Sequence, residues 1–222
     1  QGLLRVVRRD RGIRVYAVHQ HEPRPESADE RRARLDALVD AVVNIYAPLP
    51  ARSLAQFVRR LRFAAPQWSG ELTAALHRAK ERLGRAHVDG IDWFWPADED
   101  PRDWSRADDV RLLAPFDPVV KDRDRFERLW GWVYRFEAYT PPAKRIRGYY
   151  ALPLLWRDRI IGWANLSMAN GALRSDVGFV ATRPRETAFR RALDAEVARI
   201  RAFLGRLHGN MRDEAHQSSL RS

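Results

Sequence analysis

Apolar and polar residues between positions 27 and 46 recur with the period of an amphipathic helix. Ser27 and Glu30 form a capping box, in which the serine side chain accepts one free N–H group and the glutamate reaches back. Apolar residues then follow at helical spacing, namely Leu35, Leu38, Val39, Val42, Val43 and Tyr46. Pro48 and Pro50 cannot continue a helix, so the pattern predicts one helix that ends before them.

Two shorter helices and a hairpin are predicted next. One helix covers about 52–62, and the other begins after Ser69 as its cap and ends before Gly84. Asp89-Gly90 between two β-rich runs is a strong hairpin signal, and we expect Trp93 and Trp95 to face the core. Residues 27–100 thus contain three helices followed by a hairpin, which is the order of a winged helix. In such a motif the third helix would enter the major groove.

The first residues predict a separate hairpin. Residues 3–18 contain two β-rich runs around Asp10-Arg11-Gly12, with Arg8, Arg9 and Arg11 at the tip. Because an isolated hairpin is marginal in water, we interpret residues 1–26 as the wing of a truncated winged-helix motif followed by a linker. The chain opens at Gln1, and we expect a further segment upstream of it.

Residues 108–180 change to the period of strands. The β-like runs are 134–140, 148–156, 160–166 and 173–180, and they predict a small β-barrel-like sheet. Residues 181–222 predict a C-terminal amphipathic helix over 183–207 and a frayed tail. The expected fold class is therefore α+β: winged-helix motifs, a barrel-like sheet and a C-terminal helix.

Composition limits the function classes. The 222 residues carry 40 Lys and Arg against 29 Asp and Glu, a net charge of +11, and only Lys80, Lys121 and Lys144 are lysines. The absence of Cys excludes a disulfide scaffold, cysteine-ligated zinc and a cysteine nucleophile. No apolar run approaches the ~20 residues of a membrane span, so we expect a cytoplasmic protein without a membrane partner. The positive charge favours a polyanionic partner, although the codon usage of a GC-rich genome also enriches arginine.

The cations are unevenly distributed. Residues 51–85 hold eight cations against two carboxylates, whereas residues 86–100 hold five carboxylates and no cation, so we do not expect the second hairpin to lie on phosphate. The candidate DNA-contacting residues are Arg8, Arg9, Arg11, Arg78, Lys80, Arg82, Arg85, Lys144, Arg145 and Arg147. No residue qualifies as catalytic from the pattern alone. Gln20-His21-Glu22 lies in the linker, and we do not expect it to be catalytic. The pair His19 and His21 also lies there without a nearby third ligand, so we expect no metal and no cofactor.

Several linked motifs occur in one order over about 70 residues. They are LLAPFDP at 112–118, DRDRFERLWG at 122–131, YRFEAY at 134–139, GYYALP at 148–153 and DRIIG at 158–162. Together they resemble the winged-helix DNA glycosylases of the YcaQ/AlkZ type. The resemblance implies tandem winged helices on a C-terminal β-barrel, and excision of alkylated bases, including interstrand crosslinks through guanine N7. It also places the catalytic Gln-x-Asp or Gln-x-Gln motif before the first wing, which implies a position upstream of Gln1.

Two hypotheses of different classes follow. The first is the DNA-binding part of a repair glycosylase, a monomer that binds double-stranded DNA and releases no base by itself. The second is a non-catalytic winged-helix DNA-binding protein, such as a transcriptional regulator, which would dimerise on paired half-sites.

Overall fold

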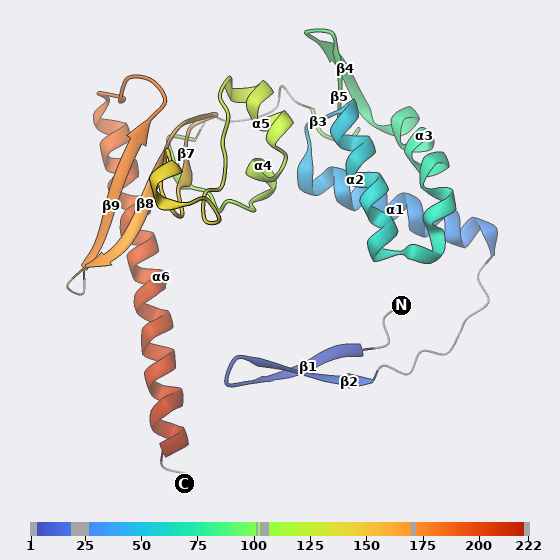
Figure 1. The fold of residues 1–222 in the computed structure, drawn as a ribbon. Coiled ribbons are helices and arrows are strands. Elements are labelled where there is room, and N and C mark those ends of the chain that lie inside the picture. The colour runs from blue at the N-terminus through green and yellow to red at the C-terminus, as the bar shows by residue number, and fades with distance from the viewer. Residues whose placement is uncertain (1–3, 19–26, 101, 103–106, 170–171, 220–222) are drawn as a thin grey trace. The chain divides into compact units, whose positions relative to one another are not determined.

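The computed structural model describes residues 4–18, 27–100, 102, 107–169 and 172–219, with side chains up to residue 205. The chain divides into two compact units, Gln1–Asp100 and Pro101–Ser222. Helices and antiparallel sheets occur in both units, which confirms the α+β class (Figure 1).

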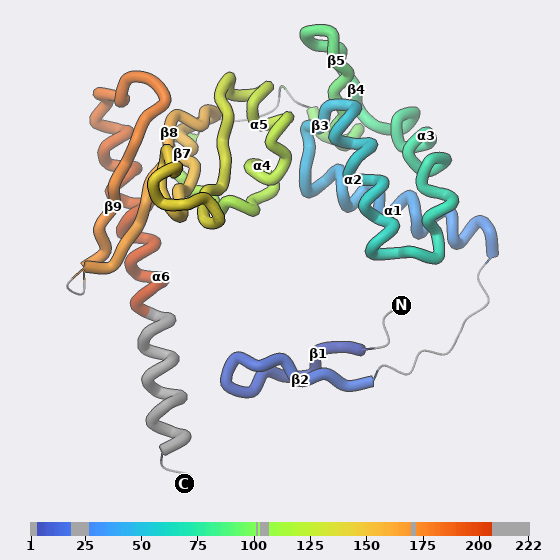
Figure 2. Tube along the Cα trace, in the orientation of Figure 1, coloured from blue at the N-terminus to red at the C-terminus, as the bar shows by residue number. Residues whose placement is uncertain are grey.

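The predicted N-terminal hairpin is present. Strands β1 (Leu4–Asp10) and β2 (Ile13–Val18) pair antiparallel, and Figure 2 shows the two strands side by side, joined by the turn. Arg11 and Gly12 form the two-residue turn with φ of 49° and 82°, the left-handed conformation that a tight hairpin turn requires. Most side chains of both strands are exposed.

The capping box starts helix α1 (Ala28–Tyr46) as predicted. Glu30 N donates to Ser27 Oγ at 3.1 Å, and Ser27 N donates to Glu30 Oε2 at 3.0 Å. After α1 the chain forms β3 (Leu49–Pro50), helix α2 (Ala51–Ala64), the 3-10 helix η1 (Pro66–Glu71) and helix α3 (Leu72–Arg82).

The second predicted hairpin completes this module. Strands β4 (Gly84–Val88) and β5 (Ile91–Trp95) pair antiparallel, and the sheet order is β3-β5-β4. Three helices followed by a hairpin between residues 27 and 96 are the order that the sequence predicts for a winged helix.

Two details of this module differ from the prediction, and one agrees with it. Ser69 does not cap α3, because η1 continues to Glu71, which takes the cap position without a side-chain hydrogen bond. Helix α3 ends at Arg82 with Leu83 as its C-cap, so it ends before Gly84 as predicted, and a Cβ atom at Gly84 would collide with the indole of Trp95. The buried face of β5 carries Phe94, with Trp93 and Trp95 half-buried, because the core that α1, α2 and α3 share receives Phe94.

The second unit contains one open sheet in the order β6-β7-β8-β9, all antiparallel. Its strands are β6 (Val110–Leu112), β7 (Leu152–Trp156), β8 (Arg159–Ala169) and β9 (Ala172–Phe179). Between β6 and β7 lie the helices α4 (Pro118–Lys121), α5 (Arg123–Trp130) and η2 (Pro142–Lys144). Within the described residues the strands do not close into a barrel.

The predicted strand at 134–140 is wrong. This segment forms no ladder, because its polar groups bond to other loops: Tyr134 OH donates to the Ala151 carbonyl at 2.7 Å, and the carboxylate of Glu137 accepts from the backbone at 146–148. Apolar and aromatic residues of 130–136 instead pack on α5 and β8.

The C-terminal helix α6 (Thr187–Ser219) starts later and ends later than the predicted range 183–207. Phe189 and Leu193 pack on the sheet, and the rings of Phe189 and Trp156 are 5.4 Å apart. In Figure 1, α6 runs beside β8 and β9. Its amphipathic pattern is therefore explained by the sheet that it covers.

A buried carboxylate joins α6 to β6. Glu196 accepts the N–H of Leu112 at 2.9 Å and two N–H groups of Arg199 at 2.7 and 2.8 Å. Although burial raises the pKa of Glu196, these hydrogen bonds and charges lower it more, so the carboxylate stays ionised.

We expect Glu196→Ala to lower the free energy of unfolding by about 2–4 kcal/mol, because a buried N–H loses its acceptor and the helix loses a contact. Glu186→Ala, which removes an exposed partner of Arg157, should cost at most about 1 kcal/mol. Urea denaturation of both variants checks this expectation. Equal losses would show that Glu196 is no more important than a surface ion pair.

Candidate nucleic-acid interface

The hairpin β1-β2 presents arginines around its turn. The register places Arg9 directly opposite Arg14, on neighbouring strands. Like charges in this relation destabilise a sheet unless an anion lies near both. Arg8, Arg9 and Arg11 are all exposed, as the sequence predicts for a hairpin tip.

Only one of these cations has a carboxylate partner. Asp10 pairs with Arg8 at 3.1 Å, and both side chains are largely exposed. Within the described residues no ion pair joins Arg9, Arg11 or Arg14 to a carboxylate. Near its turn the hairpin thus offers three guanidinium groups without an ion pair to a carboxylate among the described residues, and these suit the phosphates of a polyanion.

Helix α3 divides its cations between two faces. Arg78 and Arg82 point at α1, where Arg78 donates to Asp36 from Nε and Nη2 at 2.9 and 2.7 Å. Arg82 donates to Asp40 Oδ1 at 2.6 Å. The side-chain hydrogen bond to Asp36 raises the pKa of Arg78. These two residues therefore join α3 to α1, and their predicted contact with DNA has to compete with intramolecular partners.

Lys80 and Arg85 are exposed at the end of α3 and the start of β4. Together with His77, Glu81 and Leu83 they line a shallow hollow. Within the described residues neither Lys80 nor Arg85 is joined to a carboxylate by an ion pair. Of the four predicted residues in this region, these two are the better placed to contact a ligand.

The tip of the second hairpin carries mixed charge. His87 Nδ1 lies 2.8 Å from Asp92 Oδ1, and this hydrogen bond lowers the pKa of the Asp92 carboxyl. Asp89 is in the left-handed turn with φ of 50°. These observations agree with the expectation that this hairpin does not lie on phosphate.

The third predicted group lies in the second unit, in and after η2. Lys144 is exposed, whereas Arg145 donates to the Thr140 carbonyl at 2.8 Å and stacks on Tyr149 with 5.0 Å between guanidinium carbon and ring centre. The guanidinium of Arg147 lies 4.9 Å from the ring of Trp132 and 5.4 Å from that of Trp163. Arg147 is thus held by two indoles, and Lys144 is the freest cation of the three.

Glu137 organises this basic segment, and the sequence analysis did not identify it. Its buried carboxylate accepts the N–H groups of Ile146, Arg147 and Gly148 at 3.0, 2.8 and 3.1 Å. Burial raises the pKa of Glu137, but the three backbone donors and Arg147 outweigh burial, so the pKa is lowered. An acidic residue inside the YRFEAY motif between aromatic residues was the only available signal.

Arg14 was also missed. A two-residue turn at Arg11 and Gly12 pairs Asp10 with Ile13 and therefore Arg9 with Arg14. The sequence analysis took Asp10-Arg11-Gly12 as the turn, which leaves that register undetermined.

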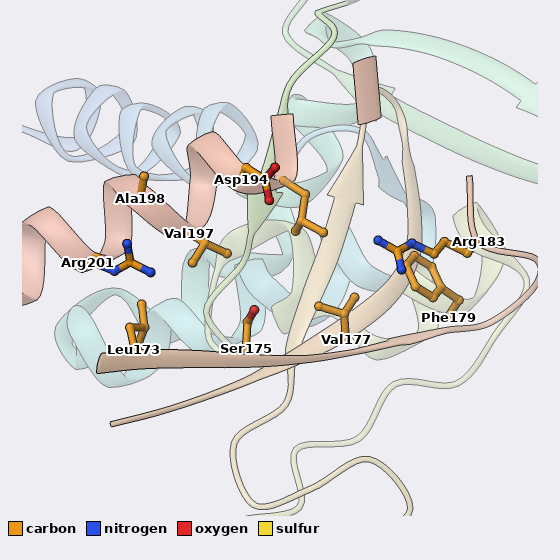
Figure 3. A pocket seen from close by; sticks show the side chains of 10 residues that line it. Leu173, Ser175, Val177, Phe179, Arg183, Asp194, Val197, Ala198 and Arg201 are labelled. Atoms are coloured by element: carbon orange, nitrogen blue, oxygen red, sulfur yellow. The ribbon is translucent and has the colours of Figure 1, made fainter. Parts of the chain in front are cut away.

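A further hollow lies between β9 and α6 (Figure 3). Its apolar floor includes Leu173 and Val177, and Arg183 and Arg201 lie toward its two ends. Asp194 on α6 also faces this hollow. Because a carboxylate accompanies the two arginines here, this hollow is less suited to phosphate than the hairpin tip, where Asp10 pairs with Arg8 alone.

Several candidates lie outside the described residues. They are Gln20-His21-Glu22 and the pair His19 and His21. In the parts of the chain that the structure describes, no three His, Asp or Glu side chains are grouped as a metal site. None of the described helices combines the length and the apolar character needed to cross a bilayer.

The fold and these surfaces define a class: an α+β protein with exposed arginines that form no ion pair among the described residues and suit a polyanionic ligand. Comparison with known families then gives the particular assignment. The AlkZ-like family, described as DNA glycosylase AlkZ-like, matches residues 1–203, and the chain belongs to it. Membership confirms the resemblance found in the sequence, and it indicates a DNA repair glycosylase with DNA as the substrate. No solved structure matches the chain.

Proposed function

We propose that this chain binds double-stranded DNA as the DNA-binding part of a repair glycosylase that acts on alkylated or crosslinked bases. The observation that carries the proposal is the hairpin β1-β2, where Arg9, Arg11 and Arg14 are exposed and have no carboxylate partner among the described residues. DNA as the partner comes from the family, and the contact surface comes from the positions of the cations.

The module 27–100 supplies the second part of the proposed surface. In a winged helix the recognition helix follows the second helix, which corresponds to α3 here. Its Lys80 and the following Arg85 would contact backbone phosphates, which position a protein on DNA without reading its sequence. Lys144 and Arg145 in the second unit are further phosphate contacts in this proposal.

The experiment is a titration of the full chain with a fluorescein-labelled 20-base-pair duplex, with and without one 7-methylguanine. We expect tight binding to both duplexes, little sequence preference and a steep loss of affinity with salt, because phosphate contacts release counterions. A discrete palindromic footprint together with a dimer in sedimentation would instead favour a transcriptional regulator. Samples of the same mixtures are also analysed for free 7-methylguanine, which measures whether the chain hydrolyses the N-glycosidic bond.

The two faces of α3 predict opposite phenotypes. We expect Lys80→Gln with Arg85→Gln to lower the affinity for duplex DNA by at least about tenfold. The loss should be the same for unrelated DNA sequences, and the melting temperature of the protein should not change. Arg78→Ala with Arg82→Ala should lower the melting temperature, because both partly buried bonds to α1 are lost. Fluorescence anisotropy and thermal denaturation of both double variants check this. Unchanged affinity in the Lys80 and Arg85 variant would remove this end of α3 from the interface.

A further inference from the structure

The second unit exposes a cluster of aromatic side chains that its cores do not use. We call Phe116, Phe136, Tyr139, Tyr149 and Tyr150 the aromatic patch. The ring of Phe136 lies at its centre, 5.4 Å from Phe116, 6.2 Å from Tyr139 and 5.1 Å from Tyr150. Exposure reaches 92% for Tyr139, 61% for Phe116 and 59% for Tyr149. The rings of Phe116, Tyr139 and Tyr150 are thus contiguous through Phe136, and Tyr149 is the chain neighbour of Tyr150. Contiguous exposed apolar surface marks a binding site more often than single exposed residues do.

Cations accompany the exposed rings. Lys121 Nζ lies 5.2 Å from the centre of the Phe116 ring, and Arg145 stacks on Tyr149 at 5.0 Å. Lys144 is exposed beside Arg145. None of these three cations is joined by an ion pair to a carboxylate in the part of the chain that the structure describes.

The carboxylates close to the patch are already bonded to the backbone. Glu137 accepts three N–H groups, and Asp117 accepts the N–H of Val119 at 2.9 Å as the cap of α4. Their charges are thus directed at peptide groups, and the side chains that extend from the patch are aromatic rings and cations. A ligand that matches both is anionic and has flat aromatic faces, as a nucleotide chain has.

The backbone that carries the patch is held in one conformation. Glu137 fixes residues 146–148, and Asn165 donates from Nδ2 to the Arg147 carbonyl at 2.6 Å. Gly148 has φ of 122°, and a Cβ atom at this position would collide with Asn165. Tyr149 and Tyr150 follow directly, so the rings are positioned before a ligand arrives, which lowers the entropic cost of binding.

We propose that the aromatic patch binds unpaired bases of DNA, which stack on Tyr139 and Tyr149 while Lys144 and Arg145 contact the phosphates. Bases within an intact duplex already stack on their neighbours, so only bases that have left the stack offer a face to these rings. This inference rests on the proposed function for its ligand, DNA, and assigns to the patch the unpaired stretch at a damaged site.

The test compares fluorescein-labelled dT20 with a 20-base-pair duplex by anisotropy, using the full chain. We expect Tyr139→Ala with Tyr149→Ala to weaken binding of dT20 about tenfold or more, because each of the two stacked bases contributes a factor of at least about five. Duplex affinity should change less than about twofold, and the salt dependence of dT20 binding should stay the same because no cation is removed. Tyr139→Phe with Tyr149→Phe should bind dT20 like the wild type.

Phe203→Ala is the matched control, because Phe203 is a 52% exposed aromatic residue of the same unit outside the patch. It should leave dT20 affinity unchanged. The inference would be overturned if the double alanine variant bound dT20 as tightly as the wild type, or if Phe203→Ala lost as much affinity. It would also be overturned if the wild-type chain bound the duplex but not dT20. In that last case the proposed function stands, whereas failure to bind either DNA would overturn both.

Discussion

Replacing Arg9 and Arg14 by glutamine is expected to lower the affinity for duplex DNA by about 10- to 30-fold at physiological salt. Each phosphate contact contributes about 0.9 to the slope of log affinity against log salt, so two lost contacts remove a slope of about 2. The same change removes two like charges that lie opposite each other in the hairpin, so stability should stay the same or rise. Loss of binding with retained stability is the signature of a contact surface.

Arg159→Gln with Arg174→Gln is the matched control, because it removes the same net charge from exposed positions on β8 and β9. We expect this control to bind duplex within about twofold of the wild type. Anisotropy titrations at several salt concentrations measure both variants. An equal effect of the two double variants would mean that total charge, and not the hairpin, determines binding.

Glu137→Gln is expected to lower the free energy of unfolding by about 3 kcal/mol. The carboxylate accepts three backbone N–H groups, and hydrogen bonds to a charged acceptor contribute about 1.5–3 kcal/mol each, of which the neutral amide oxygen keeps a part. The amide nitrogen also brings a donor into a site surrounded by donors. Glu127→Gln, at an exposed position of α5, should change the free energy by less than about 0.5 kcal/mol.

The effect of Glu137→Gln should depend on pH in one direction. The pKa of Glu137 is lower in the folded protein than its ordinary value of 4.5, so its contribution is complete above about that pH. It is lost as pH falls through the lower folded value, because the protonated carboxyl resembles the amide. Urea denaturation between pH 3 and 7 measures the difference between wild type and variant. A difference that stays constant over this range would contradict an ionised, hydrogen-bonded Glu137.

Local signals were sufficient to predict the two hairpins and the three α-helices of residues 4–96, but not β3 or η1. The capping box at Ser27 and Glu30, the proline pair after Tyr46 and the turn at Asp89 and Gly90 each act through neighbouring residues, and each is present in the structure. The start of α3 was missed because η1, which precedes it, depends on packing, whereas its end before Gly84 was predicted.

Tertiary contacts explain why the sequence alone did not predict the loop at 134–140 or the intramolecular partners of two arginines on α3. The run 134–140 has strand-like composition, yet the bonds of Tyr134 and Glu137 to the segment 146–151 place it in a loop. Arg78 and Arg82 have the same sequence character as Lys80, and only the position of α1 shows that they pair with Asp36 and Asp40. Charge patterning thus identified the cations, and the fold separated structural arginines from available ones.

The salt dependence of duplex binding by the full chain tests the central claim most directly. Six exposed cations that form no ion pair with a carboxylate in the described part of the chain are proposed as contacts, namely Arg9, Arg11, Arg14, Lys80, Arg85 and Lys144. At about 0.9 per contact they predict a slope of log affinity against log salt of about −5.4, alike for unrelated sequences, and of about −3.6 after Arg9→Gln with Arg14→Gln. A slope near zero, or the same slope in the wild type and this variant, would contradict the proposal that the hairpin arginines hold DNA.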